Sequence, residues 1–220
     1  RTPHVTTILT GAFVAVFAHH SLPHSAEFYV ERGGFPAGLG TFLSAISNAG
    51  AFGVDMFFVL SAYLITELLL RERDARGAID LKSFYIRRAL RIWPLHYFFL
   101  GLAILLTFII PTEVLPWYQA LSFAFFSGNW PFCLSLTTKT VSRLLWTVSI
   151  EEQFYVLWPL VVRQISRRAI LVATCVMIFV SMLTRGIIAS LVPVSHDMIF
   201  NNTLARLDPF AIGALLAVVL

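Results

Sequence analysis

Residues 145–162 read LWTVSIEEQFYVLWPLVV, and the interpretation of the whole chain starts from them. The stretch is apolar enough to lie in a bilayer, yet Glu151 and Glu152 stand side by side near its middle. A charged side chain at the bilayer centre costs about 2.5–3.5 kcal/mol on insertion scales, so two carboxylates are not expected to face lipid. Consecutive residues on a helix point about 100° apart. One glutamate is therefore expected to face a protein-lined cavity while the other holds a neighbouring helix. The alternative is that both lie at a membrane surface and the stretch only anchors the helix.

The composition is that of a membrane protein. Of the 220 residues, 58% are hydrophobic and 13% are charged, whereas about 25% of the residues in a soluble domain are charged. The net charge of +4 comes from basic residues between apolar runs, which is typical of cytoplasmic loops and not of a nucleic-acid interface. Cys133 and Cys175 lack the spacing of metal ligands, so no metal is expected. The placement of the basic residues likewise means that no nucleic acid is expected as a partner.

The apolar runs predict an all-α fold, a polytopic transmembrane bundle of about six spans. The expected spans are 5–18, 49–70, 92–110, 145–162, 169–191 and a last helix from about residue 204. A further apolar piece, 120–126, is too short to cross a membrane and is expected to be re-entrant or interfacial. The stretches 21–47 and 71–91 are expected to be loops. Because the chain starts and stops beside apolar runs, residues 1–220 are expected to form one partial domain of a larger bundle, truncated at both ends.

Basic residues predict the orientation. They gather in two clusters, namely Arg71, Arg73, Arg76, Lys82, Arg87, Arg88 and Arg91 in the first and Arg163, Arg167 and Arg168 in the second. If 111–143 makes no net crossing, both clusters fall on one side of the membrane. Positive charge favours the cytoplasmic side.

Two groups of residues are candidates for chemistry. His19 and His20 end the first span, where a neutral imidazole could remove a proton from a hydroxyl; the alternative is that they are interfacial polar residues. Arg87, Arg88 and Arg91 are spaced to converge on one helix patch. Guanidinium groups in such a patch suit phosphates, although contacts with lipid head groups would explain them equally well.

Further polar residues interrupt the apolar runs. Asp55 and Ser61 lie about two turns apart within GVDMFFVLSAYLIT (53–66). For Asp55, pairing with an arginine is at least as well supported as catalysis. Arg206 and Asp208 begin the last helix, where an ion pair or a cap is preferred to a binding role. The chain has no nucleotide-binding loop and no nucleophile elbow.

Five stretches, taken in order, resemble the membrane-bound acyltransferase family 3, which includes bacterial O-antigen and peptidoglycan O-acetylases. They are VAVFAHHSLP (14–23), GVDMFFVLSAYLIT (53–66), FYIRRALRIWPLHY (84–97), LWTVSIEEQFYVLWPL (145–160) and LARLDPFAIGALLA (204–217). Three positions depart from the family pattern. Ile8 stands where an arginine is common, Ala62 replaces a glycine, and Thr147 replaces a serine.

The resemblance implies a multi-pass enzyme of the bacterial cytoplasmic membrane that moves an acyl group, often acetyl from acetyl-CoA, to a hydroxyl of a carbohydrate or cell-envelope acceptor. It implies acyl-CoA as co-substrate with no permanently bound cofactor, and the donor, a glycan or other hydroxyl acceptor and the lipid bilayer as partners. Expected catalytic residues are His19, His20 and Glu151, and expected binding residues are Arg87, Arg88, Arg91, Asp55, Ser61, Glu152 and Arg206. The alternatives are a transporter with a proton path along Glu151, Glu152 and Asp55, or a lipid- or glycan-binding bundle without catalysis, which the departure at Ile8 allows.

Overall fold

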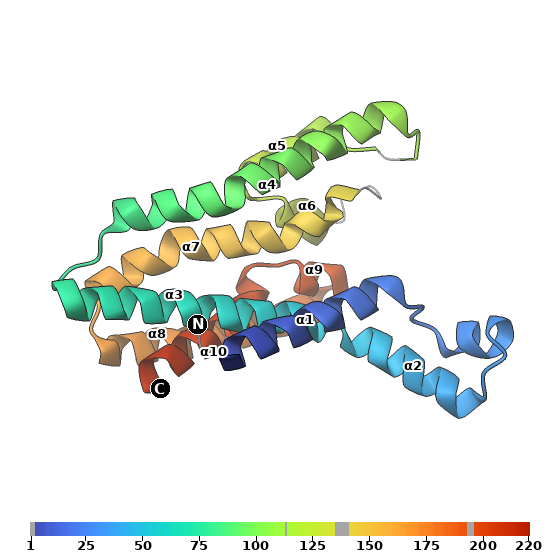
Figure 1. The fold of residues 1–220 in the computed structure, drawn as a ribbon, viewed down its shortest axis with the longest axis horizontal. Coiled ribbons are helices and arrows are strands. Elements are labelled where there is room, and N and C mark those ends of the chain that lie inside the picture. The colour runs from blue at the N-terminus through green and yellow to red at the C-terminus, as the bar shows by residue number, and fades with distance from the viewer. Residues whose placement is uncertain (1–2, 113, 135–140, 193–195) are drawn as a thin grey trace.

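The computed structural model describes residues 3–112, 114–134, 141–192 and 196–220, and within these ranges every regular element is a helix. Six helices run side by side as a bundle (Figure 1). They are α1 (Pro3–Ser21), α3 (Phe52–Arg76), α4 (Leu81–Ile109), α7 (Trp146–Gln164), α8 (Arg167–Leu191) and α10 (Leu207–Val219). The predicted all-α membrane bundle is therefore confirmed.

Three segments of the described chain are long and apolar enough to cross a membrane: Ala37–Arg76, Leu81–Ile109 and Arg167–Leu191. α7 carries too many charged residues to count among them, namely Glu151, Glu152 and Arg163. α10, with 13 residues, is too short. Large apolar side chains such as Phe98, Phe108 and Phe179 are more than 60% exposed. Such a surface is what a bilayer requires of the helices that it surrounds.

The two basic clusters lie at one end of the bundle, which we call the basic end. Arg73 Nη1 donates to the backbone carbonyls of Val162 (2.9 Å) and Ile165 (2.7 Å), which end α7. Arg167, at the start of α8, forms an ion pair with Asp74 of α3. These contacts confirm that both clusters share one side. The opposite end holds His19 and His20 and is called the histidine end.

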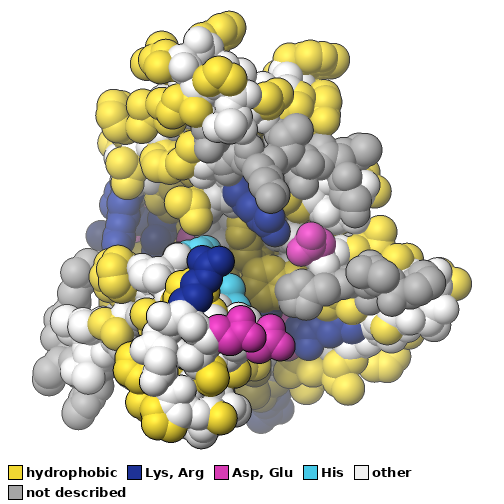
Figure 2. Space-filling model, turned by 90° about the vertical axis from the view of Figure 1, so that its right-hand side faces the viewer, with side chains coloured by type: hydrophobic (Ala, Val, Ile, Leu, Met, Phe, Trp, Pro, Cys, Tyr) yellow, Lys and Arg dark blue, Asp and Glu magenta, His cyan; other side chains and the backbone are white. Residues whose placement is uncertain are grey.

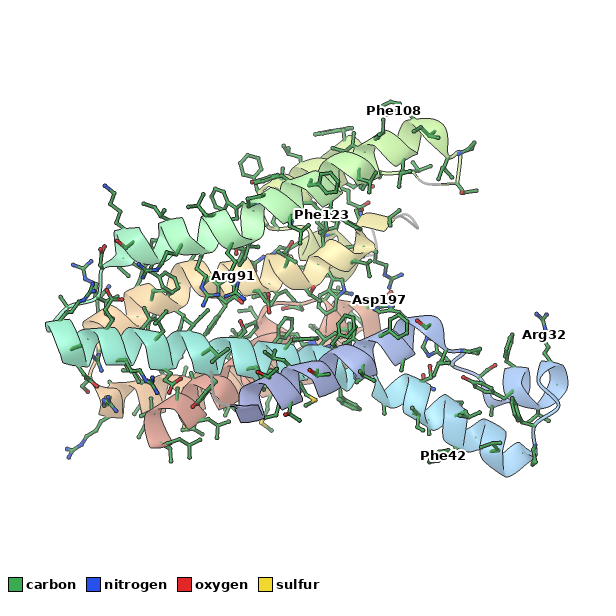
Figure 3. The ribbon with its side chains drawn as sticks, viewed as in Figure 1. Arg32, Phe42, Arg91, Phe108, Phe123 and Asp197 are labelled. Atoms are coloured by element: carbon green, nitrogen blue, oxygen red, sulfur yellow. The ribbon has the colours of Figure 1, made fainter. Side chains whose placement is uncertain are left out.

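The segment between α4 and α7 turns back inside the bundle. It contains the short helices α5 (Trp117–Ala124) and α6 (Asn129–Cys133). Halfway along α4, His96 Nε2 donates to the carbonyl of Phe123 (3.0 Å), and the Tyr97 hydroxyl donates to that of Ala124 (2.9 Å). Figure 3 shows Phe123 beneath the middle of α4. The described part of this segment thus packs against the middle of α4, and its re-entrant or interfacial character stays a prediction.

Residues 21–47 do not form the expected loop. They contain a π-helical turn, η1 (Phe28–Arg32), and a helix, α2 (Ala37–Ala49). Leu39, Phe42 and Ile46 recur at helical spacing, and this signal was hidden by the glycines and serines between them. Gly40 permits close packing on η1, since a Cβ there would lie 3.0 Å from Val30 Cγ2. Phe42 points outward from α2 (Figure 3).

The expected loop 71–91 is also mostly helical. α3 continues to Arg76 and α4 begins at Leu81, because arginine and glutamate favour helix as strongly as leucine does. Gly77 ends α3 with a positive φ of 72°. Asp80 caps α4 by accepting hydrogen bonds from the Ser83 amide (3.1 Å) and hydroxyl, and these bonds lower the pKa of its carboxyl group.

Small residues bring α1 and α10 against α3, the central helix. A Cβ at Gly213 would lie 2.0 Å from the Val59 carbonyl oxygen, and one at Gly50 would lie 2.3 Å from that of Ala15. Small residues at helix interfaces let backbones approach closely, as is common in membranes. The contact at Gly50 fixes the position of the His19 end of α1.

Candidate functional site

Two cavities meet at the histidine end. The inner chamber, about 490 Å³, is lined mainly by apolar side chains together with His19, His20, Thr147 and Glu151. The outer chamber, about 690 Å³, is more polar, and its lining includes His19, His20, His24, Asn48, Arg143 and Asp197. Figure 2 shows this end hollowed near its centre, with histidine side chains on the wall. His19 and His20 line both chambers and so lie on their boundary.

The imidazole of His19 has a defined proton position. Its Nδ1 lies 2.8 Å from the backbone carbonyl oxygen of Ser47, in α2. A carbonyl oxygen only accepts hydrogen bonds, so the neutral ring must carry its proton on Nδ1. Nε2 then keeps a lone pair. An imidazole in this tautomer can act as a base or as a nucleophile.

A third histidine joins this arrangement. His24 Nδ1 lies 2.9 Å from the hydroxyl of the fully buried Ser47, and its ring centroid is 4.6 Å from that of His19. Ser47 therefore supports both rings, His19 through its carbonyl and His24 through its hydroxyl. Sequence reasoning passed over both residues. The third histidine in HHSLPH (19–24) was a signal for His24, whereas nothing marked Ser47.

The paired glutamates point to different places, as the helical geometry predicts. Glu151 lines the inner chamber. Glu152 is 6% exposed and lines a separate cavity of about 750 Å³ beside α7 and α8. Trp93 Nε1 donates to Glu152 Oε2 at 3.2 Å, while Oε1 has no hydrogen-bond partner among the described residues. Glu151 thus shares a chamber with His19, and Glu152 holds α4.

The three arginines of α4 do not form one patch. The Arg88 guanidinium is half-buried over the rings of Phe84 (5.7 Å) and Tyr155 (5.2 Å). Arg91 is exposed and extends from α4 on the side of α7 in the view of Figure 3. Arg87 is exposed and interacts electrostatically with Asp80. Helical spacing permits three neighbours to converge, but here the packing of α4 on α7 partly buries only Arg88 of the three.

Arg88 and His19 lie in separate cavities. The cavity at Arg88, about 220 Å³, is also lined by Glu152 and Tyr155 and has no lining residue in common with the inner chamber. The Tyr155 hydroxyl makes a hydrogen bond with the Ser61 hydroxyl, which ties α7 to α3. Because Tyr155 follows Glu151 by one helical turn, this tyrosine separates the two cavities.

Asp55 and Arg206 pair with each other outside both chambers. Their side chains approach to 2.5 Å, and the Arg206 guanidinium lies 4.1 Å from the ring centroid of Phe200. Arg185 and Asp208 form a second pair at 2.5 Å beside the same cavity of about 450 Å³. Phe200 also lines the inner and outer chambers. The two ion pairs therefore lie on the far side of Phe200 from the two chambers and hold this part of their wall in place. In the described parts of the chain, no cluster of three His, Cys, Asp or Glu side chains could hold a metal ion.

Comparison with known proteins decides the family. Residues 10–219 match the model of a family described as an acyltransferase domain. The chain belongs to this acyltransferase family. The family's name agrees with the geometry at His19, since acyl transfer to a hydroxyl uses a base that removes the proton of that hydroxyl.

Individual relatives of this acyltransferase are bacterial O-acetyltransferases. The peptidoglycan O-acetyltransferase OatA of Listeria monocytogenes is 31% identical over 166 residues, which is 71% of this chain and 23% of that protein. The putative peptidoglycan O-acetyltransferase YrhL of Bacillus subtilis is 34% identical over 52% of this chain and 19% of its own. A putative O-acetyltransferase of Staphylococcus aureus is 30% identical over 77% of this chain and 30% of its own. The chain thus spans less than a third of these relatives, and no solved structure matches it.

Proposed function

We propose that this chain carries the reaction chamber of an O-acetyltransferase that moves an acetyl group from acetyl-CoA to a hydroxyl of a cell-envelope glycan. The observation that carries the proposal is His19, with Nδ1 bonded to Ser47 and its ring in the same chamber as Glu151. Membership of the acyltransferase family and the names of the relatives support the choice of acetyl. The apolar helices and the two basic clusters support a multi-pass protein of the bacterial cytoplasmic membrane, with the basic end inside.

The chemical step follows from the tautomer of His19. Nε2 takes the proton of the acceptor hydroxyl while its oxygen attacks the thioester carbonyl. A carbon–oxygen bond forms, the carbon–sulfur bond breaks, and the proton passes from the imidazolium to the thiolate, which leaves as free CoA. The imidazolium carries a positive charge during this step. Glu151, in the same largely apolar chamber, offsets that charge where screening by water is weak.

The donor is assigned to the basic end. Arg88 is half-buried there and Arg91 is exposed one turn further along α4, and guanidinium groups bind phosphates through paired hydrogen bonds. An acyl arm extending from Arg88 meets Tyr155 and Ser61 before it reaches the inner chamber. The reaction therefore requires the Tyr155 side chain to leave Ser61 when the donor binds.

Arg88→Ala is expected to weaken acetyl-CoA binding by about tenfold or more, since charged hydrogen bonds contribute about 1.5–3 kcal/mol. Equilibrium binding of radiolabelled acetyl-CoA to the full-length protein in detergent measures this. Arg168→Ala removes an exposed arginine at the same end and serves as the matched control. Equal losses of acetyl-CoA affinity in both variants would show that Arg88 contributes only general positive charge and no specific donor contact. If the unmodified protein neither binds acetyl-CoA nor transfers label to peptidoglycan, the proposed function is wrong.

Gly50→Ala is expected to lower the transfer rate by about tenfold to a hundredfold, because displacing a reacting group by about 1 Å can cost a hundredfold. A Cβ at residue 50 would lie 2.8 Å from His19 Cβ and would push α1 away. Gly11→Ala is the control, because Gly11 lies on α1 itself and a Cβ there would meet nothing within 4 Å. Initial rates and thermal unfolding of both variants are compared. An active Gly50→Ala protein would show that the contact does not position His19.

A proton-path transporter finds less support. That interpretation needs Glu151, Glu152 and Asp55 along one route. The three carboxylates open onto different cavities, and Asp55 is paired with Arg206.

A further inference from the structure

We propose that the outer chamber is the acceptor subsite of this enzyme and takes a neutral sugar, whose hydroxyls are bound by Arg143 and Asp197. The inference rests on the proposed function, because it names where the second substrate of that reaction binds. Arg143 and Asp197 lie outside the five stretches on which the family resemblance rests, and both line the outer chamber at the histidine end.

The two chambers differ in chemistry. The inner chamber offers Glu151 and Thr147 among mainly apolar side chains, which suits an acetyl thioester. The outer chamber offers imidazole, amide, guanidinium and carboxylate groups, which suit a ligand with many hydroxyls. His19 borders both. An acceptor in the outer chamber would therefore approach the His19 ring from the chamber that Glu151 does not line.

The charges of the outer chamber favour a neutral ligand. Arg143 Nη2 and Asp197 Oδ1 are 3.7 Å apart, so the two side chains balance each other without a direct hydrogen bond between these atoms. Both side chains are more than half exposed. Among the lining residues that the structure describes, a phosphorylated acceptor would face the Asp197 carboxylate beside one guanidinium, that of Arg143. A sugar can instead accept from Arg143 and donate to Asp197 with neighbouring hydroxyls.

The apolar part of the chamber fits the same ligand. The rings of Trp146 and Phe200 lie 5.1 Å apart, between centroids, and both line the chamber. A pyranose presents a face of C–H groups that can be buried against aromatic rings. The volume of about 690 Å³ lies within the usual range of small-molecule sites. Polar groups at the rim and rings on the wall thus match the two kinds of surface that a sugar has.

The test uses the full-length protein in detergent, with acetyl-CoA as donor and chitopentaose as the acceptor probe. Two rates are measured: acetyl transfer to the sugar, and acetyl-CoA hydrolysis without sugar, in which water replaces the acceptor. Arg143→Ala and Asp197→Asn are each expected to raise the KM for chitopentaose by about tenfold or more, as when a charged hydrogen bond is lost. Hydrolysis and the KM for acetyl-CoA are expected to stay within about twofold.

Arg32→Ala is the matched control, since Arg32 is exposed on η1 at the same end and does not line the chamber. An unchanged KM for the sugar in both chamber variants, or a parallel fall in hydrolysis, would overturn the subsite. Hydrolysis by the unmodified protein without transfer to chitopentaose would overturn the sugar assignment. Absence of both activities would count against the proposed function itself.

Discussion

Replacing His19 with alanine is expected to lower the rate of acetyl transfer by about a thousandfold or more, the upper part of the range for a positioned general base. The ring lies on the boundary of the two chambers, and Nδ1 is committed to Ser47. No other described imidazole has both properties, since the structure shows no hydrogen bond from His20 to a backbone carbonyl and His24 lines only the outer chamber. The full-length variant is assayed in membranes with labelled acetyl-CoA.

His20→Ala is the comparison that makes this result specific. His20 borders the same two chambers, so its removal changes their volume and polarity in a similar way. We expect it to lose less than about tenfold in rate, the loss of one modest contact. If His20→Ala is inactive while His19→Ala retains activity, the base is His20. Binding of acetyl-CoA, measured on both variants, shows whether each is still folded.

Glu151→Gln is expected to lower kcat by about a hundredfold with little change in either KM. The substitution keeps the shape of the side chain and removes the charge that offsets the imidazolium of His19. Losing one electrostatic group aimed at a developing charge costs about 10²–10³ in kcat. Because the charge on His19 exists only during the reaction, the effect falls on kcat and not on ground-state binding.

Glu152→Gln offers a matched control at the next position. Its carboxylate accepts from Trp93 and lies outside the inner chamber. We expect a reduction of less than about tenfold, accompanied by lower thermal stability, since a buried hydrogen bond to a charged group is weakened. A larger loss of kcat in Glu152→Gln than in Glu151→Gln would contradict the assignment of the two carboxylates.

Local physics predicted the parts of the fold that depend on one helix at a time. The cost of a carboxylate in lipid placed Glu151 in a cavity, and the angle between neighbours on a helix sent Glu152 elsewhere. Basic residues predicted the shared end of α3, α7 and α8. By contrast, α2 was missed because glycine and serine between its apolar residues gave the composition of a loop.

The site depended on contacts between helices that sequence spacing does not contain. The partner of Asp55 is 151 positions away, and Ser47 reaches His19 across 28. Arg87 has the right spacing to join Arg88, yet the packing of α4 turns it toward Asp80. Residue types indicated which side chains carry chemistry. Only the three-dimensional arrangement showed that His19 divides a polar from an apolar chamber.

The support of His19 by a backbone carbonyl has an evolutionary consequence. A side-chain partner would vanish with a single codon change, whereas the carbonyl of residue 47 persists whatever amino acid stands there, provided that α2 keeps its path. The reactive tautomer is therefore robust to point mutation at its own support. Substitution at position 47 is expected instead to affect His24, which bonds to the serine hydroxyl. It would thereby change the lining of the outer chamber and leave the hydrogen bond of His19 in place.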